Sequence, residues 1–305
     1  MNTKGIVTTL MVSIVTLSAF SQVTENERKL RVIQTDTVIG WKKGIATSLN
    51  MSQTSLINWS SGGENSYSIN GMISTFATYK SPTTSWENTL DMGYGLMQQG
   101  SKGMQKTDDR FDLTSKYGKK AFSNFYYTGL MNFKSQFAPG YNYDQIPNIK
   151  TSNILAPAYL LAAIGLNYLP NPYFNAFIAP LTGKLTIVAD TALSNRGTFG
   201  VTPGNKSRSE FGGYARFSFT KNDFKPEFLK NVSLSSKLDL FSNYLNNPQN
   251  VDVSWENILL MKVNKYVGIT LNTHLLYDAD IKDPIDGKAK IQFKEILGVG
   301  FSYKF

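Results

Sequence analysis

The sequence predicts an all-β protein: a transmembrane, antiparallel, up-and-down β-barrel of about 12 strands, with short periplasmic turns and longer extracellular loops. Three observations predict it. Apolar and polar residues alternate along most of the chain, the connections between alternating segments differ regularly in length, and the chain ends in an aromatic residue, Phe305. The mean hydropathy of −0.22 is too polar for a bundle of transmembrane helices, each of which needs about 20 nearly unbroken apolar residues.

The N-terminus has the pattern of a secretory signal peptide. A basic residue, Lys4, precedes an apolar stretch at 6–20, and Ala19 and Ser21 supply the small residues of a cleavage site. We therefore expect cleavage after Ser21 and export to the cell outer membrane, with a buried N-terminal helix as the alternative. The predicted parts of the chain are a signal peptide (1–21), a periplasmic N-terminal lead-in (22–39) and the outer-membrane barrel (40–305).

Alternation with a period of two is clearest at 266–278. Val267, Ile269 and Leu271 share one face of this segment, while Thr270 and His274 share the other. Such alternation is typical of a strand with one apolar face. The predicted strands are 41–57, 65–79, 84–98, 108–118, 122–137, 153–168, 173–189, 210–220, 229–244, 250–264, 266–278 and 289–305.

The connections between these strands predict a membrane barrel rather than a soluble sandwich. Short ones lie at 80–83, 119–121, 170–172, 221–228 and 265, and longer ones, richer in Gly, Asn and Pro, lie at 58–64, 99–107, 138–152, 190–209, 245–249 and 279–288. A sandwich has no reason to sort its loops by length, whereas outer-membrane barrels do so. Aromatic residues near the strand ends are expected to form two interfacial girdles.

The end of the last strand indicates a partner during biogenesis. Phe301, Tyr303 and Phe305 occupy alternating positions up to the C-terminus. This pattern resembles the signal that the barrel-assembly machinery recognises. We expect that machinery to fold the chain into the membrane.

Four local patterns together resemble one family of Bacteroidota outer-membrane proteins known only as a domain of unknown function. The resemblance covers roughly 40–305 and implies a barrel of Gram-negative origin, but it brings no catalytic or binding residue with it. The patterns are Trp59-Ser60-Ser61-Gly62-Gly63-Glu64-Asn65, Pro180-Leu181-Thr182-Gly183-Lys184, Leu238-Asp239-Leu240-Phe241-Ser242-Asn243-Tyr244 and Asn250-Val251-Asp252-Val253-Ser254-Trp255-Glu256.

The composition offers little catalytic chemistry, so no enzyme, cofactor or metal site is expected. There is no cysteine, and His274 is the single histidine, on the polar face of its strand. The acidic stretch at 278–286 departs from an EF-hand because Lys282 interrupts it and Glu295 lies too far on. A solvated loop is favoured there, with opportunistic calcium binding as the alternative. The sequence has no glycine-rich phosphate loop before a helix, so nucleotide binding is not expected. The predicted outer-membrane location excludes nucleic acid as a partner, despite the net charge of +9.

Charged residues on the polar strand faces are expected to pair inside the barrel, because buried charges need partners. Lys294 belongs to this set by its position, whereas Glu295 falls on the lipid face, which requires either a bulge or contact with a subunit. The predicted lumen network is Glu87, Asp91, Arg110, Asp112, Lys116, Arg216, Lys237, Asp239, Asp252, Glu256, Lys262 and His274.

The remaining basic residues are assigned to turns and loops. Those on the extracellular side, including Lys102, Lys106, Lys184, Arg196, Lys206 and Arg208, can bind lipopolysaccharide phosphates or simply confer solubility.

Three functions remain open. A narrow channel or small-solute binding barrel is favoured, because a balanced, charged interior in a barrel of this size predicts a narrow lumen, and 190–209 is long enough to plug it. The alternative is a closed structural or surface-interaction barrel that binds lipopolysaccharide or a partner through its loops. A lipid-modifying enzyme centred on His274 is the least favoured.

Overall fold

The computed structural model describes residues 39–57, 63–143, 147–221, 224–263, 267–281 and 287–301. The predicted signal peptide, the lead-in up to residue 38, Tyr303 and Phe305 lie outside the described residues. The same holds for the side chains of Lys262 and Phe301.

The chain forms one antiparallel sheet of 12 strands whose spatial order follows the sequence, which confirms the predicted all-β, up-and-down fold. β1 and β14 are the two ends of this order. The strands are β1 (Gly40–Thr54), β2 (Ser66–Lys80), β3 (Thr84–Gln99), β4 (Gln105–Lys120), β5 (Phe125–Ser135), β8 (Ala158–Asn171), β9 (Phe174–Ile187), β10 (Ser207–Lys221), β11 (Val232–Asn243), β12 (Val251–Lys262), β13 (Val267–Tyr277) and β14 (Gln292–Phe301).

Two connections differ from the prediction. The segment 138–152 contains a separate hairpin of β6 (Gly140–Asn142) and β7 (Ile149–Ser152), and 222–231, expected to be short, contains the 3₁₀ turn η2 (Glu227–Leu229). The 3₁₀ turn begins after Pro226, which lacks the N–H that a continuing strand needs. In the described part of the chain, no helix has the length and hydropathy to cross a membrane.

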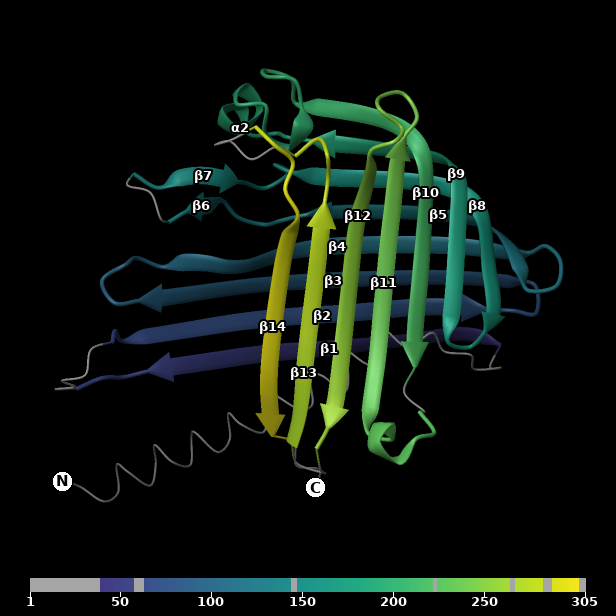
Figure 1. The fold of residues 1–305 in the computed structure, drawn as a ribbon, viewed down its shortest axis with the longest axis horizontal. Coiled ribbons are helices and arrows are strands. Elements are labelled where there is room, and N and C mark those ends of the chain that lie inside the picture. Colours follow the sequence, from purple (N-terminus) through teal and green to yellow (C-terminus); the bar gives the residue numbers. More distant parts are fainter. Residues whose placement is uncertain are drawn as a thin grey trace.

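The sheet curls so that its two halves face each other. Figure 1 shows β1–β5 behind β10–β14, with the strands of the two layers crossing, and β8 and β9 bending from one layer into the other. The long connections lie toward the upper left of this view and the short turns toward the lower right. Below, the first is called the long-loop end and the second the short-turn end.

A bulge in β9 and two glycines opposite it allow the bend. The register of β9 shifts against both neighbouring strands, next to Gly165 in β8 and next to Gly212 in β10. A Cβ at Gly165 would lie 2.0 Å from the carbonyl oxygen of Ile178, and one at Gly212 would lie 1.9 Å from that of Ser242. Only glycine fits at these contacts, and bulges of this kind increase the twist of a strand.

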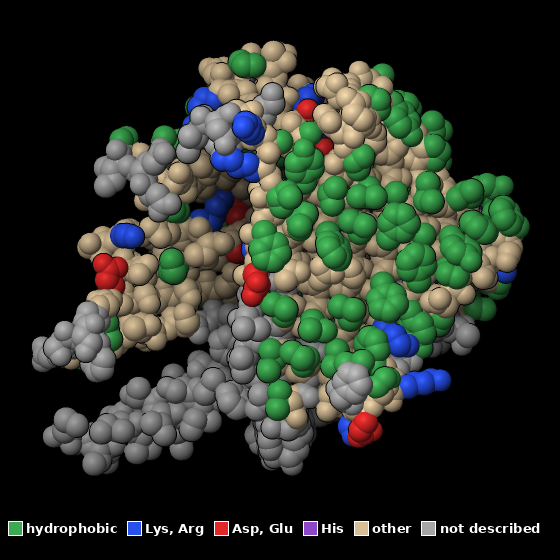
Figure 2. All heavy atoms as spheres, in the orientation of Figure 1, with side chains coloured by type: hydrophobic (Ala, Val, Ile, Leu, Met, Phe, Trp, Pro, Cys, Tyr) green, Lys and Arg blue, Asp and Glu red, His purple; other side chains and the backbone are tan. Residues whose placement is uncertain are grey.

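The two faces of the sheet have opposite character. The outward face exposes large apolar side chains in the middle of the strands, including Met131, Ile164, Ile178 and Leu181. Figure 2 shows hydrophobic side chains spread over the face of the front strands, and acidic and basic atoms in the hollow to its left. The inward face buries polar side chains, including Asp112, Asn132, Asn167, Thr182, Glu210 and Asp239.

Candidate functional site

The first wall of the interior is formed by β3, β4 and β5, with Asp112 at its centre. Asp112 accepts a hydrogen bond from Nδ2 of Asn132 at 2.7 Å, and its Oδ2 lies 3.4 Å from Arg110 Nη2 and 3.7 Å from Lys134 Nζ. The same Nη2 lies 3.9 Å from Asp91. These distances define a connected set of two cations and two carboxylates on three adjacent strands.

The second wall comes from β10–β13. Asp239, 8% exposed, accepts hydrogen bonds from the Tyr214 hydroxyl at 2.7 Å and from both Nε and Nη2 of Arg216. Lys237 Nζ lies 3.0 Å from Glu256. Two charge pairs therefore stand side by side, because Lys237 and Asp239 are two residues apart on the same strand face.

His274 joins the second wall through β13. Its Nε2 lies 3.0 Å from Ser254 Oγ and 3.9 Å from Glu256 Oε1. In a serine hydrolase the serine contacts Nε2 while a carboxylate holds Nδ1–H of the same ring. Here the serine and the carboxylate approach the same nitrogen, so the arrangement differs from that of a catalytic triad.

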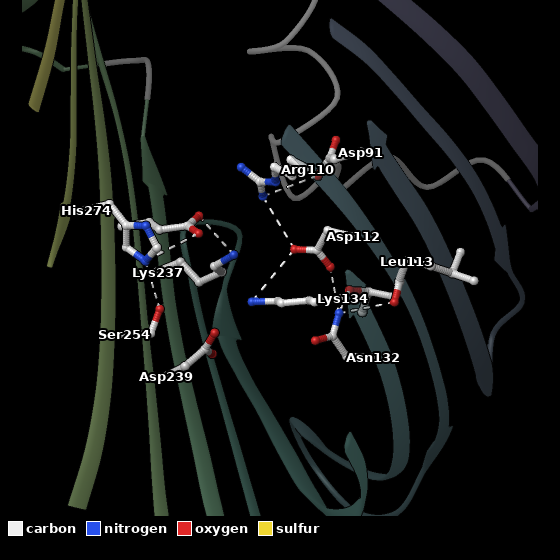
Figure 3. A network of polar contacts seen from close by, with 12 residues as sticks. Asp91, Arg110, Asp112, Leu113, Asn132, Lys134, Lys237, Asp239, Ser254 and His274 are labelled. Carbon is white, nitrogen blue, oxygen red and sulfur yellow. Dashed lines mark hydrogen bonds and ion pairs between the residues drawn. The ribbon is translucent and has the colours of Figure 1, made fainter. Parts of the chain in front are cut away.

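The two walls face each other across the interior. Figure 3 shows Arg110, Asp112 and Lys134 on one side, pointing toward Lys237 and His274 on the other. Arg110 interacts electrostatically with Glu256, and Asp112 with Lys237. The ion pairs and hydrogen bonds named above lie within each wall. Between the walls, opposite charges such as Arg110 and Glu256 attract each other at longer range.

A third group of charges lies closer to the long-loop end. Lys184 Nζ is 2.7 Å from Asp252, 3.5 Å from Glu210 and 3.8 Å from Asp278. Arg208 is 2.8 Å from Glu210 and 3.0 Å from Asp280. Assigning Lys184 and Arg208 to turns and loops was therefore wrong: they belong to β9 and β10, and their side chains are inside.

Most of the predicted lumen residues lie within these groups. Glu87 and Lys116 form a separate pair at 3.1 Å nearer the short-turn end, and Lys262 is placed only by its backbone in β12. Lys294 lies opposite His274 in the β13–β14 register, and Glu295 lies opposite Thr273 without a register shift. Glu295 therefore faces outward, and the bulge proposed to turn it inward is absent from the described part of this strand pair.

Sequence reasoning missed several members of the network. Asn132 and Lys134 are two residues apart in a predicted strand and therefore lie on the same face, so the alternation of side chains could have placed both in the interior. Glu210 and Tyr214 are even positions of β10, like the predicted inward residue Arg216, so alternation along this strand was a usable signal for them as well.

The segment between β9 and β10 covers the long-loop end. Asp190 caps the short helix α2 (Thr191–Asn195) and also binds Lys150 Nζ and Asn153 Nδ2, both at 2.9 Å. The pKa of Asp190 is lowered below its ordinary value, mainly by the hydrogen bond from Lys150. The hydrogen bonds from Asn153 and from the Leu193 N–H lower it further.

A small apolar cluster packs this segment against the turn before β8. The cluster consists of Ala156, Val188, Leu193 and Val201, with Phe199 against it. The segment is therefore anchored at the strand ends, above Lys184 and Arg208, and its contacts with β6–β7 and this turn hold it at the mouth of the interior.

Comparison with known proteins finds a match to one family model over part of the chain. A family model described as "Protein of unknown function (DUF3078)" matches residues 51–141, which include Asp91, Arg110 and Asp112. This agrees with the predicted resemblance to a family of unknown function, while the Bacteroidota origin stays a prediction. Among curated proteins, none matches the chain.

One solved structure with a similar course of the chain is the translocator domain of the autotransporter NalP from Neisseria meningitidis. The sequences are 12% identical, the likeness covers 93% of this chain and 94% of that one, and the TM-score is 0.39.

Proposed function

We propose that this chain is an outer-membrane β-barrel that acts as a narrow channel, or as a binding barrel, for small polar solutes. The observation that carries the proposal is the pair of walls, each with charges of both signs, which face each other inside a sheet whose outer face is apolar. The predicted signal peptide at 1–21 is the reason for including export to the outer membrane in the proposal. No catalytic role forms part of the proposal.

A membrane environment explains the outward face. Ile164 is 65% exposed and Leu181 is 57% exposed, although each lies in the middle of a strand. Moving one such side chain from water into an apolar phase contributes about 1.5–3 kcal/mol. Soluble monomers rarely leave apolar surface on this scale in contact with water, whereas lipid removes the cost.

The interior supports a narrow passage for small polar solutes. One part is filled by the apolar cluster of Leu130, Ala163, Phe177, Ala179, Tyr214 and Phe241, which leaves less room than an open porin offers. In the remainder, a solute passing between Arg110 and Lys237 moves close to charges of both signs. Because the signs are balanced, such a passage discriminates by size and polarity more than by charge.

Single-channel recording in planar bilayers tests the proposal. We expect small conductance steps for the wild-type protein and larger steps for Arg110→Ser/Lys237→Ser, which removes two long side chains from opposite walls. Lys102→Gln, at an exposed position in the β3–β4 connection, is the control and should leave the steps unchanged. The channel hypothesis is overturned if neither the wild-type protein nor the double variant gives conductance steps above background.

A closed barrel that acts through its loops is the second candidate, favoured by the position of α2 and its anchors at the mouth. Deleting 191–205 distinguishes the two. In a closed barrel the deletion opens the conductance, whereas in a narrow channel the charged walls still limit it. In that second role, Lys102 and Lys206 are the exposed groups that we propose for lipopolysaccharide phosphates, because Lys106, Lys184 and Arg208 are engaged by carboxylates of the chain.

A further inference from the structure

A row of aromatic side chains crosses four strands at the short-turn end. Trp41, Tyr79, Trp86 and Tyr117 are successive partners in the registers of β1–β2, β2–β3 and β3–β4. The ring of Trp41 lies 5.5 Å from that of Tyr79 and 5.6 Å from that of Trp86. Trp41, Trp86 and Tyr117 are exposed on the outward face, so the row is available to a bilayer.

Lysines flank this row. Lys119 and Lys120 end β4 and are exposed beyond Tyr117, and Lys43 follows Trp41 on the outward face of β1. The Lys43 ammonium lies 5.7 Å from the Trp41 ring centroid, so its side chain reaches back toward the row. We call Trp41, Tyr79, Trp86, Tyr117, Lys43, Lys119 and Lys120 the basic aromatic rim.

The rim carries positive charge without local compensation. Among the described residues, Lys43, Lys119 and Lys120 have no carboxylate within ion-pair distance. Glu87, the nearby acidic residue of β3, points inward and pairs with Lys116 at 3.1 Å.

The long-loop end is different, because its basic groups are largely neutralised. Lys106 lies 2.8 Å from Asp109, Lys150 lies 2.9 Å from Asp190, and Arg208 lies between Glu210 and Asp280. On β1–β5 and their connections, three lysines without an ion pair, Lys43, Lys119 and Lys120, therefore lie at the short-turn end, against Lys102 at the long-loop end.

We propose that the basic aromatic rim binds the headgroups of anionic phospholipids in the leaflet that faces the short turns. This inference rests on the proposed location in a membrane. Aromatic rings set the level of the headgroups, and at that level each ammonium meets the phosphodiester oxygens. A zwitterionic headgroup brings its own ammonium, which the lysines repel, whereas an anionic headgroup does not. The surface therefore selects net negative lipid, such as phosphatidylglycerol, over phosphatidylcholine.

Tryptophan fluorescence reports on this leaflet directly. The chain has four tryptophans, and a Trp59→Phe/Trp255→Phe background leaves Trp41 and Trp86 as fluorophores. The protein is reconstituted in mixed vesicles in which either phosphatidylglycerol or phosphatidylcholine is brominated, at equal fractions. The ratio of the two quenching curves gives the relative binding constant of the two lipids at the rim.

We expect a preference for phosphatidylglycerol of about fivefold for each lysine that meets a phosphate. In Lys43→Gln/Lys119→Gln/Lys120→Gln the preference should fall toward one, and in the wild type it should weaken at 1 M salt because screening shortens the range of the charges. The matched control, Lys102→Gln/Lys206→Gln, removes exposed lysines from the long-loop end and should keep the preference.

The outcomes separate this inference from the proposed function. Absence of quenching by either brominated lipid places the tryptophans outside the bilayer and overturns the proposed function. Equal quenching by both lipids, or a preference that the triple variant retains, overturns the rim while leaving the barrel in the membrane. Heat-modifiable migration on gels checks that each variant is folded. If the triple variant fails this check, Lys119→Gln/Lys120→Gln, confined to the strand end, replaces it.

Discussion

Removing the carboxylate of Asp239 is expected to destabilise the barrel by about 4 kcal/mol. Asp239 is buried and accepts hydrogen bonds from the Tyr214 hydroxyl and from two N–H groups of Arg216. In Asp239→Ala the guanidinium stays inside without its partner, which typically costs about 3–5 kcal/mol. The Tyr214 hydroxyl also loses its acceptor, and about 1 kcal/mol of the expected total comes from this loss.

The assay is urea unfolding of the protein reconstituted in vesicles, followed by far-ultraviolet circular dichroism and by migration of unheated samples on gels. The double variant Arg216→Met/Asp239→Leu removes both charges and should lose less than about 1 kcal/mol, because the cost of desolvating the pair disappears with the pair. Glu227→Ala, which breaks the exposed contact with Lys230, should also lose less than about 1 kcal/mol. The reasoning is refuted if Asp239→Ala is as stable as wild type, or if the double variant is as unstable as the single one.

Three further predictions concern the mouth, the bend and the last strand. Because the folded pKa of Asp190 is lowered, the stability that its carboxylate gives to α2 is fully present above its unfolded pKa of about 3.9 and is lost as the pH falls through the folded value. Hydrogen exchange of the α2 amides should therefore quicken only below about pH 4. Asp190→Ala removes the cap at a cost of about 1–2 kcal/mol and should quicken this exchange at every pH. Gly165→Ala should lose about 1–3 kcal/mol or fail to fold, since its Cβ would meet the carbonyl of Ile178 at 2.0 Å, while Gly183→Ala, with open space around its Cβ, should unfold at the wild-type urea concentration. Glu295→Leu should raise stability in vesicles by about 1–2 kcal/mol, and unchanged stability would show that this position is not exposed to lipid.

The strands and their faces were predictable because alternation is a local property. Arg110, Asp112 and Lys116 lie at even positions of one predicted strand, and all three point inward. Which charge meets which partner was not predictable. The pair Arg216–Asp239 depends on the β10–β11 register, which follows from the length and shape of a connection that contains η2.

Lys184 shows where local parity fails. Counting by two from the buried Phe177 places Lys184 on the outward face. The β9 strand carries an extra residue near Pro180 and Leu181, where its pairing with both β8 and β10 shifts. Beyond this bulge the inward positions become even, so that Lys184 meets Asp252 and Glu210. A bulge inverts every later side chain of its strand, and periodicity alone does not contain its position.

For the membrane location proposed above, the distribution of charge gives the molecule a direction. In the described part of the chain, the cations of the interior network stand next to carboxylates, and the middle of the outward face is apolar. At the long-loop end, ion pairs such as Lys150–Asp190 hold the connections in place. Among the described residues, Lys43, Lys119 and Lys120 form no such ion pair. Their charge therefore acts on what lies outside the protein, at the level of the headgroups next to the short turns.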